Sequence, residues 1–305
     1  MKKFDLIDKK ISQFFNLYWL RPENVPWDLH VYKIFQKNFK INKLSRSLEI
    51  GSGTGFNSLL NLNGELNKKF DFFFNANVKS FYKNKDIYDS KILFNAKINL
   101  VSKPAENRFD LVLDLKKNLI NKSKLLNISK KYNVFDCNND IAKFGRFDFI
   151  YTSIIYWLNN PYKSIINIKK SINHNGHFLF TIPNQNFLKY CKSYTPRGKL
   201  WSLINRGRKK TLKLIIEENL FENWLKKNQL DIVSKNYFLS KKTLEIWDLG
   251  LRPISPLLIK MANSLDFDTR SLIKKEWCNN LMPIVKELSY EELFYGKKKA
   301  VTVCI

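Results

Sequence analysis

Cysteine and histidine are scarce in this chain of 305 residues, which contains four of the first and three of the second. The cysteines stand far apart and lack the short paired spacing of zinc ligands. We therefore expect a reduced, cytoplasmic protein without a metal site. The four positions are Cys137, Cys191, Cys278 and Cys304.

Long apolar runs are also missing. None approaches the ~18 residues that a membrane-spanning helix needs, so the sequence predicts no transmembrane segment. No internal repeat and no linker rich in Gly, Ser or Pro divides the chain, which indicates a single domain with insertions. Charged residues near the N-terminus interrupt any apolar stretch before a secretory leader could form, namely Asp5, Asp8, Lys9 and Lys10.

Acidic residues are few: Asp and Glu number 27 against 53 Lys and Arg, which gives a net charge of +26. Such a charge attracts phosphate backbones. However, the basic residues are 44 Lys and only 9 Arg, and there are also 35 Asn. This joint excess is typical of codon drift in an AT-rich genome, whereas a phosphate-binding surface is expected to use more Arg. A nucleic-acid partner is therefore not favoured, and the basic cluster at 206–213 is interpreted as a solvated surface.

The most informative segment is Leu48-Glu-Ile-Gly-Ser-Gly-Thr-Gly55. A short apolar strand (47–50) carries Glu49 near its end, and a glycine-rich turn then opens a helix. Three glycines in five residues, Gly51, Gly53 and Gly55, allow backbone N–H groups to approach a ligand closely. Ser52 lies between the first two.

Strands and helices alternate regularly from residue 109 onward, which predicts an α/β fold with a parallel sheet. Strands are expected at 47–50, 109–114, 132–136, 147–152, 177–182, 230–238 and 300–304. Helices are expected at 4–18, 27–39, 116–130, 161–172 and 217–227, with a further helical region at about 242–293.

Polar side chains follow the predicted strands where a doubly wound sheet binds its ligand, at the carboxyl ends. They are Glu49, Asp114, Asp136, Thr152 and Ser153. A dinucleotide loop would place its third glycine three residues after the second, and a phosphate loop would end in Lys-Ser/Thr. Neither pattern is present, and acids would repel a pyrophosphate. The set suits a ligand with a ribose diol, an amino group and a cationic centre.

Read in order, these motifs resemble the class I S-adenosylmethionine-dependent methyltransferases of the small-molecule type. Residues 49–55 resemble the glycine-rich first motif, and 147–153 resemble the motif beside the transferred methyl group. Residues 172–180 are similar to the helix, glycine turn and strand that follow. The resemblance implies a Rossmann-like, doubly wound, seven-stranded sheet, mostly parallel with an antiparallel last strand.

The same resemblance implies S-adenosylmethionine as cofactor. It implies that Asp114 binds the ribose hydroxyls and that Asp136 and Cys137 flank the adenine. The remaining cofactor-binding positions would be Glu49, Gly51, Ser52, Gly53, Gly55, Thr152 and Ser153. Plainer roles stay open: the glycines can serve only a tight turn, Asp114 can cap the next helix, and Asp136 suits a turn.

The spacing departs from the family pattern, because the ribose acid usually follows the loop by about twenty residues, whereas Asp114 follows Gly55 by 59. Either 56–108 carries an insertion, or 70–74 is the second strand and Asn75 or Asn77 lies at the ribose. We favour the insertion, because a helix and then Asp136 follow Asp114.

An oxygen acceptor needs a base with a suitable pKa. His30, in a helix that could cap the site, is the candidate base, and Tyr156 is the second catalytic candidate. Tyr151, Ser153 and Trp157 are expected to line the acceptor pocket with Tyr156. Asp248 and Arg252 are candidate acceptor contacts, although a structural ion pair is the favoured interpretation.

The sequence thus predicts a methyltransferase that acts on a small or carrier-linked metabolite, such as an intermediate of glycan, lipid or secondary-metabolite synthesis. The motifs that hold a flipped base, or attack cytosine C5, are absent. The alternatives are an RNA methyltransferase, a protein methyltransferase and a non-catalytic protein of the same fold. The expected organisation is an N-terminal helical cap (1–45), a cofactor-binding core (46–185, with the insertion 56–108) and C-terminal strands (186–305, with the helical insertion about 242–293).

Overall fold

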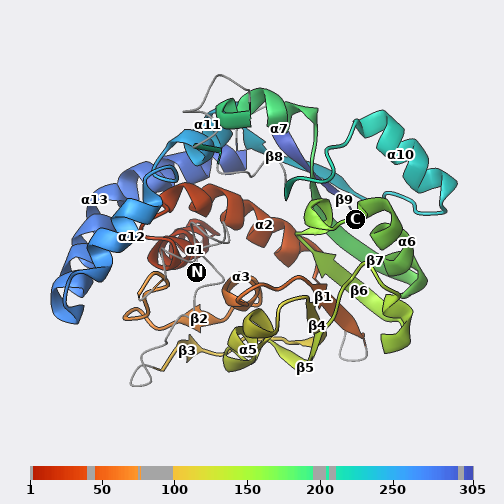
Figure 1. Ribbon diagram of the computed structural model, residues 1–305, viewed down its shortest axis with the longest axis horizontal. Helices are drawn as coiled ribbons and strands as arrows, with labels where there is room; N and C mark the ends of the chain where they lie inside the picture. The colour runs from red at the N-terminus through yellow and green to blue at the C-terminus, as the bar shows by residue number, and fades with distance from the viewer. Residues whose placement is uncertain are drawn as a thin grey trace.

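In the computed structural model, seven strands form one sheet in the order β5-β4-β1-β6-β7-β9-β8 (Figure 1). The structure describes residues 3–39, 45–74, 76, 99–194, 204–205, 211–294 and 299–304. The strands are β1 (Ser47–Ile50), β4 (Phe109–Asp114), β5 (Ser129–Val134), β6 (Phe147–Thr152), β7 (Ile172–Pro183), β8 (Lys235–Ser240) and β9 (Lys299–Cys304).

Five neighbouring strands, from β5 to β7, run parallel, and β9 is antiparallel to both β7 and β8. The predicted α/β fold with a mostly parallel sheet is therefore confirmed. The strands β1 and β4 lie side by side in register, with Leu48 opposite Leu111 and Ile50 opposite Leu113. These four side chains are buried on one face of the sheet, so Glu49 projects from the other face.

Helices cover both faces of the sheet. Apolar side chains of α6 (Pro161–Lys170) and α10 (Glu218–Lys227) pack in the same core cluster as Leu48 and Ile50. The opposite face, which carries Glu49, is covered by α2 (Val25–Asn38), α3 (Phe56–Asn61) and α5 (Lys117–Leu125), whose apolar residues share one large cluster. Short elements complete the chain: η1 (Pro22–Asn24), η3 (Ile141–Phe144), η4 (Ile155–Trp157), α7 (Gln185–Tyr190) and η5 (Lys192–Tyr194).

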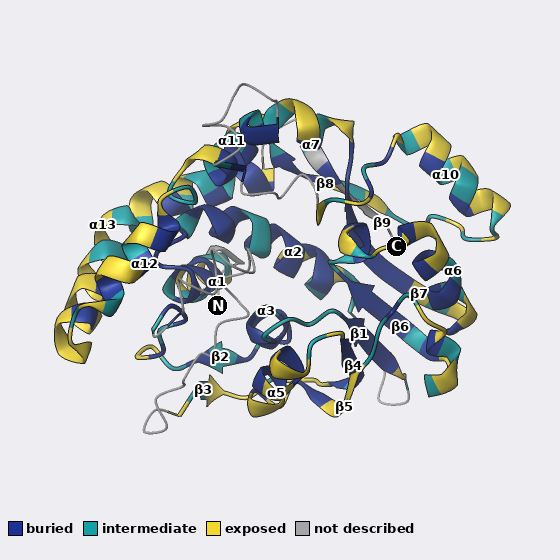
Figure 2. Cartoon of the chain, viewed as in Figure 1, coloured by how far each residue is buried: buried dark blue, intermediate teal, exposed yellow. Residues whose placement is uncertain are grey.

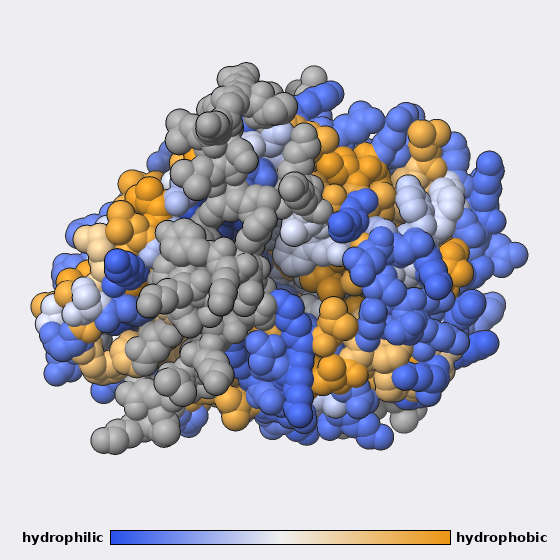
Figure 3. All heavy atoms as spheres, viewed as in Figure 1, coloured by the Kyte–Doolittle hydropathy of each residue, from blue (hydrophilic) through white to orange (hydrophobic). Residues whose placement is uncertain are grey.

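The N-terminal helices and the C-terminal helical region pack together, although they are distant in sequence. The helices α1 (Lys3–Leu17) and α2 contact the long α13 (Phe267–Phe294), as Figure 1 shows. Two shorter helices, α11 (Lys241–Leu249) and α12 (Ser255–Asn263), precede it. Figure 2 shows that α12 and α13 keep an exposed outer side, and Figure 3 shows apolar side chains among polar ones near that edge. On α12, Leu257 and Met261 are exposed.

The segment 56–108 adds no strand to the seven-stranded sheet in the part that the structure describes. Its strands β2 (Glu65–Leu66) and β3 (Val101–Lys103) form a separate two-stranded sheet. Residues 70–74 form turns, so the alternative in which they are the second strand is wrong. Asn75, Asn77 and the basic residues 206–210 lie outside the described residues.

Several predicted boundaries were wrong. The strand expected at 132–136 is β5, which ends at Val134, so Asp136 lies two residues beyond it. The helix expected to run to Lys130 ends at Leu125, and Asn127 then adopts a left-handed conformation with φ 50°. The strand expected to begin at Leu230 begins at Lys235. No helix among the described residues is long and apolar enough to cross a membrane.

Candidate functional site

The glycine-rich loop follows β1, and all three of its glycines have positive φ: 76° at Gly51, 58° at Gly53 and 81° at Gly55. A Cβ on Gly51 would lie 2.2 Å from Cδ1 of Ile154, and one on Gly55 would lie 2.9 Å from Cβ of Ser123. A Cβ on Gly53 would meet no atom of the described residues within 4 Å. Close contacts within the fold therefore require glycine at positions 51 and 55, whereas no described residue crowds Gly53.

Asp114, the last residue of β4, fixes this loop. Its Oδ2 accepts a hydrogen bond from the Gly53 N–H at 3.0 Å, and its Oδ1 accepts one from the Lys116 N–H at 3.0 Å. Asp114 as a whole residue is 7% exposed. The parallel pairing of β1 with β4 thus brings Asp114 to the loop despite 59 intervening residues.

Glu49 projects beneath the first turn of α3. Its Oε1 accepts a hydrogen bond from the Ser58 hydroxyl at 2.7 Å, while its Oε2 is buried without a hydrogen-bond partner in the described part of the chain. The Ser52 hydroxyl is also buried without a hydrogen-bond partner among the described residues. Burial raises the pKa of Glu49 to about 8, with a further contribution from Asp114. Unsatisfied buried polar atoms are rare in proteins, and two of those found among the described residues belong to the loop region.

Asp136 and Cys137 lie next to Asp114, because the Phe135 N–H donates to the Asp114 backbone carbonyl at 2.9 Å. Burial raises the pKa of the Cys137 thiol to about 12, and the negative charges of Asp114 and Asp136 add to it. One oxygen of Asp136 accepts hydrogen bonds from the backbone and side chain of Asn138, so part of its role is to form a turn.

The end of β6 closes the other side of the loop. Thr152 is fully buried, and its hydroxyl accepts a hydrogen bond from the Ile154 N–H at 3.3 Å. Ser153 interacts with the hydroxyl of Tyr151, which is buried opposite Glu49 in the sheet register. Tyr156 follows in η4 and is 5% exposed. The structure therefore brings the predicted residues of β1, β4 and β6 together.

The structure does not bring His30 into this group. Its ring stacks on Phe238 of β8, with centroids 5.1 Å apart and an interplanar angle of 9°. Burial lowers its pKa to about 3, and Lys299 and Lys33 lower it further. An imidazole in this setting stays neutral and packs as a core side chain.

Asp28, two residues earlier on α2, lies on a different side of that helix and was missed by the sequence analysis. Its Oδ1 accepts a hydrogen bond from Asn57 Nδ2 at 3.1 Å, directly after the glycine loop. Although the side chain keeps some solvent contact, burial raises its pKa to about 8, against the opposing effect of Arg21. Acidic residues are common in the first turn of a helix, so the sequence did not identify Asp28 as a site residue.

Asp248 is anchored inside the protein by Ser193. It is fully buried, and its two oxygens accept hydrogen bonds from the backbone N–H and the hydroxyl of Ser193, at 2.8 and 2.6 Å. The ion pair with Arg252 stays a prediction. The Arg252 guanidinium lies over the Trp247 ring, 3.8 Å from its centroid.

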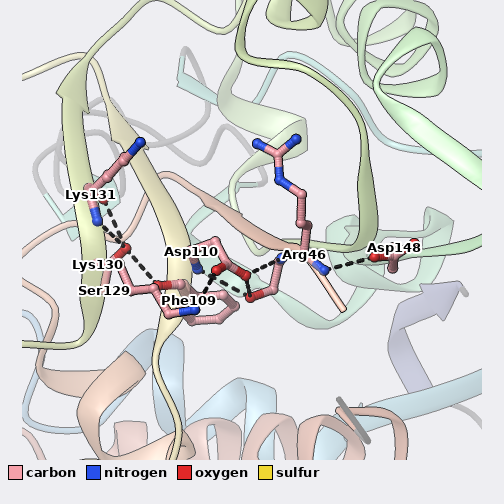
Figure 4. A network of polar contacts seen from close by, with 8 residues as sticks. Arg46, Phe109, Asp110, Ser129, Lys130, Lys131 and Asp148 are labelled. Carbon is pink, nitrogen blue, oxygen red and sulfur yellow. Dashed lines mark hydrogen bonds and ion pairs between the residues drawn. The ribbon is translucent and has the colours of Figure 1, made fainter. Parts of the chain in front are cut away.

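A second polar network lies at the amino ends of the strands, opposite the glycine loop (Figure 4). Asp110 Oδ2 accepts hydrogen bonds from the Ser47 N–H and hydroxyl, at 2.8 and 3.1 Å, and its Oδ1 pairs with Lys130 at 2.7 Å. Asp148 accepts a hydrogen bond from the Arg46 N–H at 2.7 Å. These acids tie neighbouring strands together at their amino ends, where a doubly wound sheet has no ligand site.

Comparison with known proteins gives structural likenesses only. No protein-family model matches the sequence, and no curated protein matches it. The chain is similar to an S-adenosylmethionine-dependent methyltransferase from Geobacter sulfurreducens in complex with S-adenosyl-L-homocysteine, with 10% identity and a TM-score of 0.44 over 90% of this chain and 89% of that one. The corresponding enzyme from Thiobacillus denitrificans, also with that ligand, has 10% identity and a TM-score of 0.42 over 100% and 96%.

A third similar structure is the plantazolicin methyltransferase BpumL, also in complex with S-adenosyl-L-homocysteine. It has 11% identity and a TM-score of 0.43, and the match covers 99% of this chain and 87% of that one. At these identities, a function for this chain has to be argued from its own residues. Among the residues described here, no group of three or more His, Cys, Asp or Glu side chains could hold a metal ion.

Proposed function

We propose that this protein is a class I S-adenosylmethionine-dependent methyltransferase whose acceptor is a small or carrier-linked metabolite. The observation that carries the proposal is the loop after β1. There Gly53 has a left-handed conformation, and among the residues that the structure describes no atom crowds it and two buried polar atoms of the loop region, Glu49 Oε2 and Ser52 Oγ, have no hydrogen-bond partner. A loop with unsatisfied polar atoms and an uncrowded glycine is suited to hold a polar ligand.

The residues present suit the parts of that cofactor. The carboxyl oxygens of Glu49 and Asp114 can accept hydrogen bonds from hydroxyl and ammonium donors, and the Gly51–Gly55 backbone allows close approach. Asp136 and Cys137, beside Asp114, would lie along the adenine, and Thr152 and Ser153 along the end that carries the methyl group. Bound there, S-adenosylmethionine would supply a methyl group already activated as a sulfonium.

The task left to the chain is to position the acceptor, which by itself can lower a barrier by roughly 7–11 kcal/mol. We propose that the acceptor pocket is lined by residues at and just after the end of β6, namely Tyr151, Ser153 and Tyr156. Tyr156 is a candidate for hydrogen bonding to the acceptor, since burial raises the pKa of its hydroxyl and keeps it protonated. His30 is not proposed as the base, because it packs on Phe238.

Isothermal titration of S-adenosylmethionine and S-adenosylhomocysteine into the wild type tests this proposal, with Gly53→Ala as the matched variant. We expect micromolar binding to the wild type. The added methyl group projects where no described residue crowds Gly53, so binding should weaken at least about tenfold, while the left-handed backbone costs about 1–2 kcal/mol of stability.

Gly51→Ala should behave differently, because its Cβ collides with Ile154 and the whole fold is destabilised. Thermal unfolding of both variants separates the two effects. Absence of binding to the folded wild type would overturn the proposed function and favour a non-catalytic protein of this fold.

A further inference from the structure

Asn57, the second residue of α3, is held by two side chains from the N-terminal part of the chain. The Tyr18 hydroxyl donates a hydrogen bond to Asn57 Oδ1 at 2.8 Å, and Asn57 Nδ2 donates one to Asp28 Oδ1 at 3.1 Å. Tyr18 follows the end of α1, and Asp28 lies in the first turn of α2. One side-chain amide therefore joins both N-terminal helical segments to the start of α3.

The start of α3 is continuous with the glycine loop. Gly55 is the N-cap residue of α3, its N–H donates to the Ser52 carbonyl at 3.0 Å, and its own carbonyl accepts from the Leu59 N–H at 2.9 Å. Glycines leave the loop backbone many accessible conformations. The loop conformation therefore depends on what holds its ends, which are Asp114 bound to the Gly53 N–H on one side and α3 on the other.

Tyr18 contacts the start of α3 in a second way, through a shared aromatic neighbour. Its ring packs edge-to-face on Phe72 with centroids 5.9 Å apart, and Phe56, the first residue of α3, packs edge-to-face on the same ring at 5.5 Å. Replacing Tyr18 by Phe would keep this ring packing and remove only the hydroxyl that binds Asn57.

The residue after Tyr18 is fixed from another direction. Trp19 is 1% exposed, and its Nε1 donates to Asp71 Oδ1 at 2.9 Å. The other oxygen of Asp71 accepts a hydrogen bond from Arg270 Nε of α13 at 2.6 Å. Contacts outside α3 thus immobilise the end of α1. A hydrogen bond can position its partner when the group that makes it is itself held by packing and further hydrogen bonds.

We propose that Tyr18 is a positioning residue for the ligand loop: through Asn57 it holds the first turn of α3, and with it the glycine loop, in the conformation that binds the ligand. The inference rests on the proposed function, under which that ligand is S-adenosylmethionine. A loop that is already in its binding conformation loses less conformational freedom when the ligand binds, so loss of the Tyr18 hydroxyl should weaken binding.

The far end of α3 offers a matched control. The Tyr32 hydroxyl donates to Asn63 Oδ1 at 3.0 Å, and Asn63 lies just beyond the C-terminal end of α3. Tyr18 and Tyr32 are each 7% exposed. Tyr18→Phe and Tyr32→Phe therefore remove the same hydroxyl, from the same kind of bond, at opposite ends of one helix. The two variants should lose a similar, small amount of thermal stability.

Isothermal titration with S-adenosylmethionine and S-adenosylhomocysteine separates the two tyrosines. We expect Tyr18→Phe to bind both ligands about three- to tenfold more weakly than the wild type. The loss should be the same for the two ligands, because the loop and not the transferred methyl group is affected. Tyr32→Phe should keep the affinity of the wild type.

Hydrogen exchange of the ligand-free protein is a second measurement. Tyr18→Phe should increase the exchange of backbone amides in residues 51–59, where the loop and the first turn of α3 lie. Tyr32→Phe should leave this segment unchanged. A merely structural role of Tyr18 would raise exchange throughout the protein instead, in proportion to the lost stability.

A double variant tests whether Tyr18 acts through Asn57. If it does, adding Tyr18→Phe to Asn57→Ala should cause no further loss of affinity, because the acceptor of its hydrogen bond is already gone. An additional loss as large as that of Tyr18→Phe alone would show that Tyr18 acts by another route, and would overturn the inference.

The outcomes distinguish this inference from the proposed function. If the wild type binds both ligands and Tyr18→Phe binds them equally well, Tyr18 does not position the loop and the proposed function stands. Equal losses of affinity in Tyr18→Phe and Tyr32→Phe would also overturn the inference, since they would reflect general destabilisation. If the folded wild type binds neither ligand, the proposed function fails, and the role of Tyr18 in ligand binding fails with it.

Discussion

Asp114→Asn is expected to weaken the binding of both S-adenosylmethionine and S-adenosylhomocysteine by about a hundredfold, which corresponds to about 3 kcal/mol. The two oxygens of Asp114 accept the N–H groups of Gly53 and Lys116, and an Asn side chain has only one oxygen. Its amide nitrogen would face a backbone donor and release one side of the loop. The change also removes the negative charge proposed to bind the ribose hydroxyls. Isothermal titration at constant pH measures the loss.

Asp110→Asn is the matched control, because it makes the same chemical change in the same strand, β4, at the opposite end. Asp110 binds Ser47 and Lys130 at the amino edge (Figure 4), so its replacement should lower stability and leave ligand affinity unchanged. Equal loss of affinity in the two variants would show that the effect comes from general damage to the sheet. Retained affinity in Asp114→Asn would remove Asp114 from the proposed ribose contact.

Arg270→Ala is expected to lower the free energy of unfolding by about 3–5 kcal/mol, because it leaves a buried carboxylate without its ion-pair partner. Arg270 Nε lies 2.6 Å from Asp71 Oδ2, and the two side chains are 2% and 8% exposed. Trp19 Nε1 donates to the other oxygen of Asp71 at 2.9 Å. The pair ties the segment after α3 to the start of α13. Chemical denaturation measures the change.

The exposed pair of Lys242 and Glu291 provides the comparison, and Lys242→Ala should leave the free energy of unfolding nearly unchanged. Burial by itself would raise the pKa of Asp71, but the Arg270 hydrogen bond and the charges of Lys274 and Arg270 lower it. The stabilisation is therefore present above the ordinary pKa of Asp and is lost as the pH falls through the lowered value. An Arg270→Ala protein as stable as the wild type would show that the pair contributes nothing.

The strand pattern was predictable because buried parallel strands read as short apolar runs between helices. Phe109 to Asp114 and Phe147 to Thr152 are strands with the predicted limits. The limits predicted for the edge strand β5 were wrong. Five of its six residues are not fully buried, and its sequence, Ser129–Val134, is mostly polar. Edge strands contain charged residues that hide the apolar signal.

The candidate site was predicted in part. Glu49 and Asp114 meet at the glycine loop because they follow neighbouring strands, and strand ends can be read from sequence. His30 was chosen because few other bases exist, but its side of α2 packs on Phe238. Which side of a helix faces a site depends on how that helix packs, and no local pattern encodes this.

The sequence by itself determined the parallel α/β core, the glycine loop and the acids at the strand ends, because periodicity and turn chemistry are local properties. Only the tertiary structure decided that α2 turns Asp28 toward Asn57, that α13 packs along α1 and α2, and that Arg270 reaches Asp71 across 199 positions. These contacts join residues far apart in the chain. They form because α2 buries an apolar side, whereas α13 buries Arg270 and other polar side chains together with Val285 and Leu293, and this packing fixes where the polar side chains point.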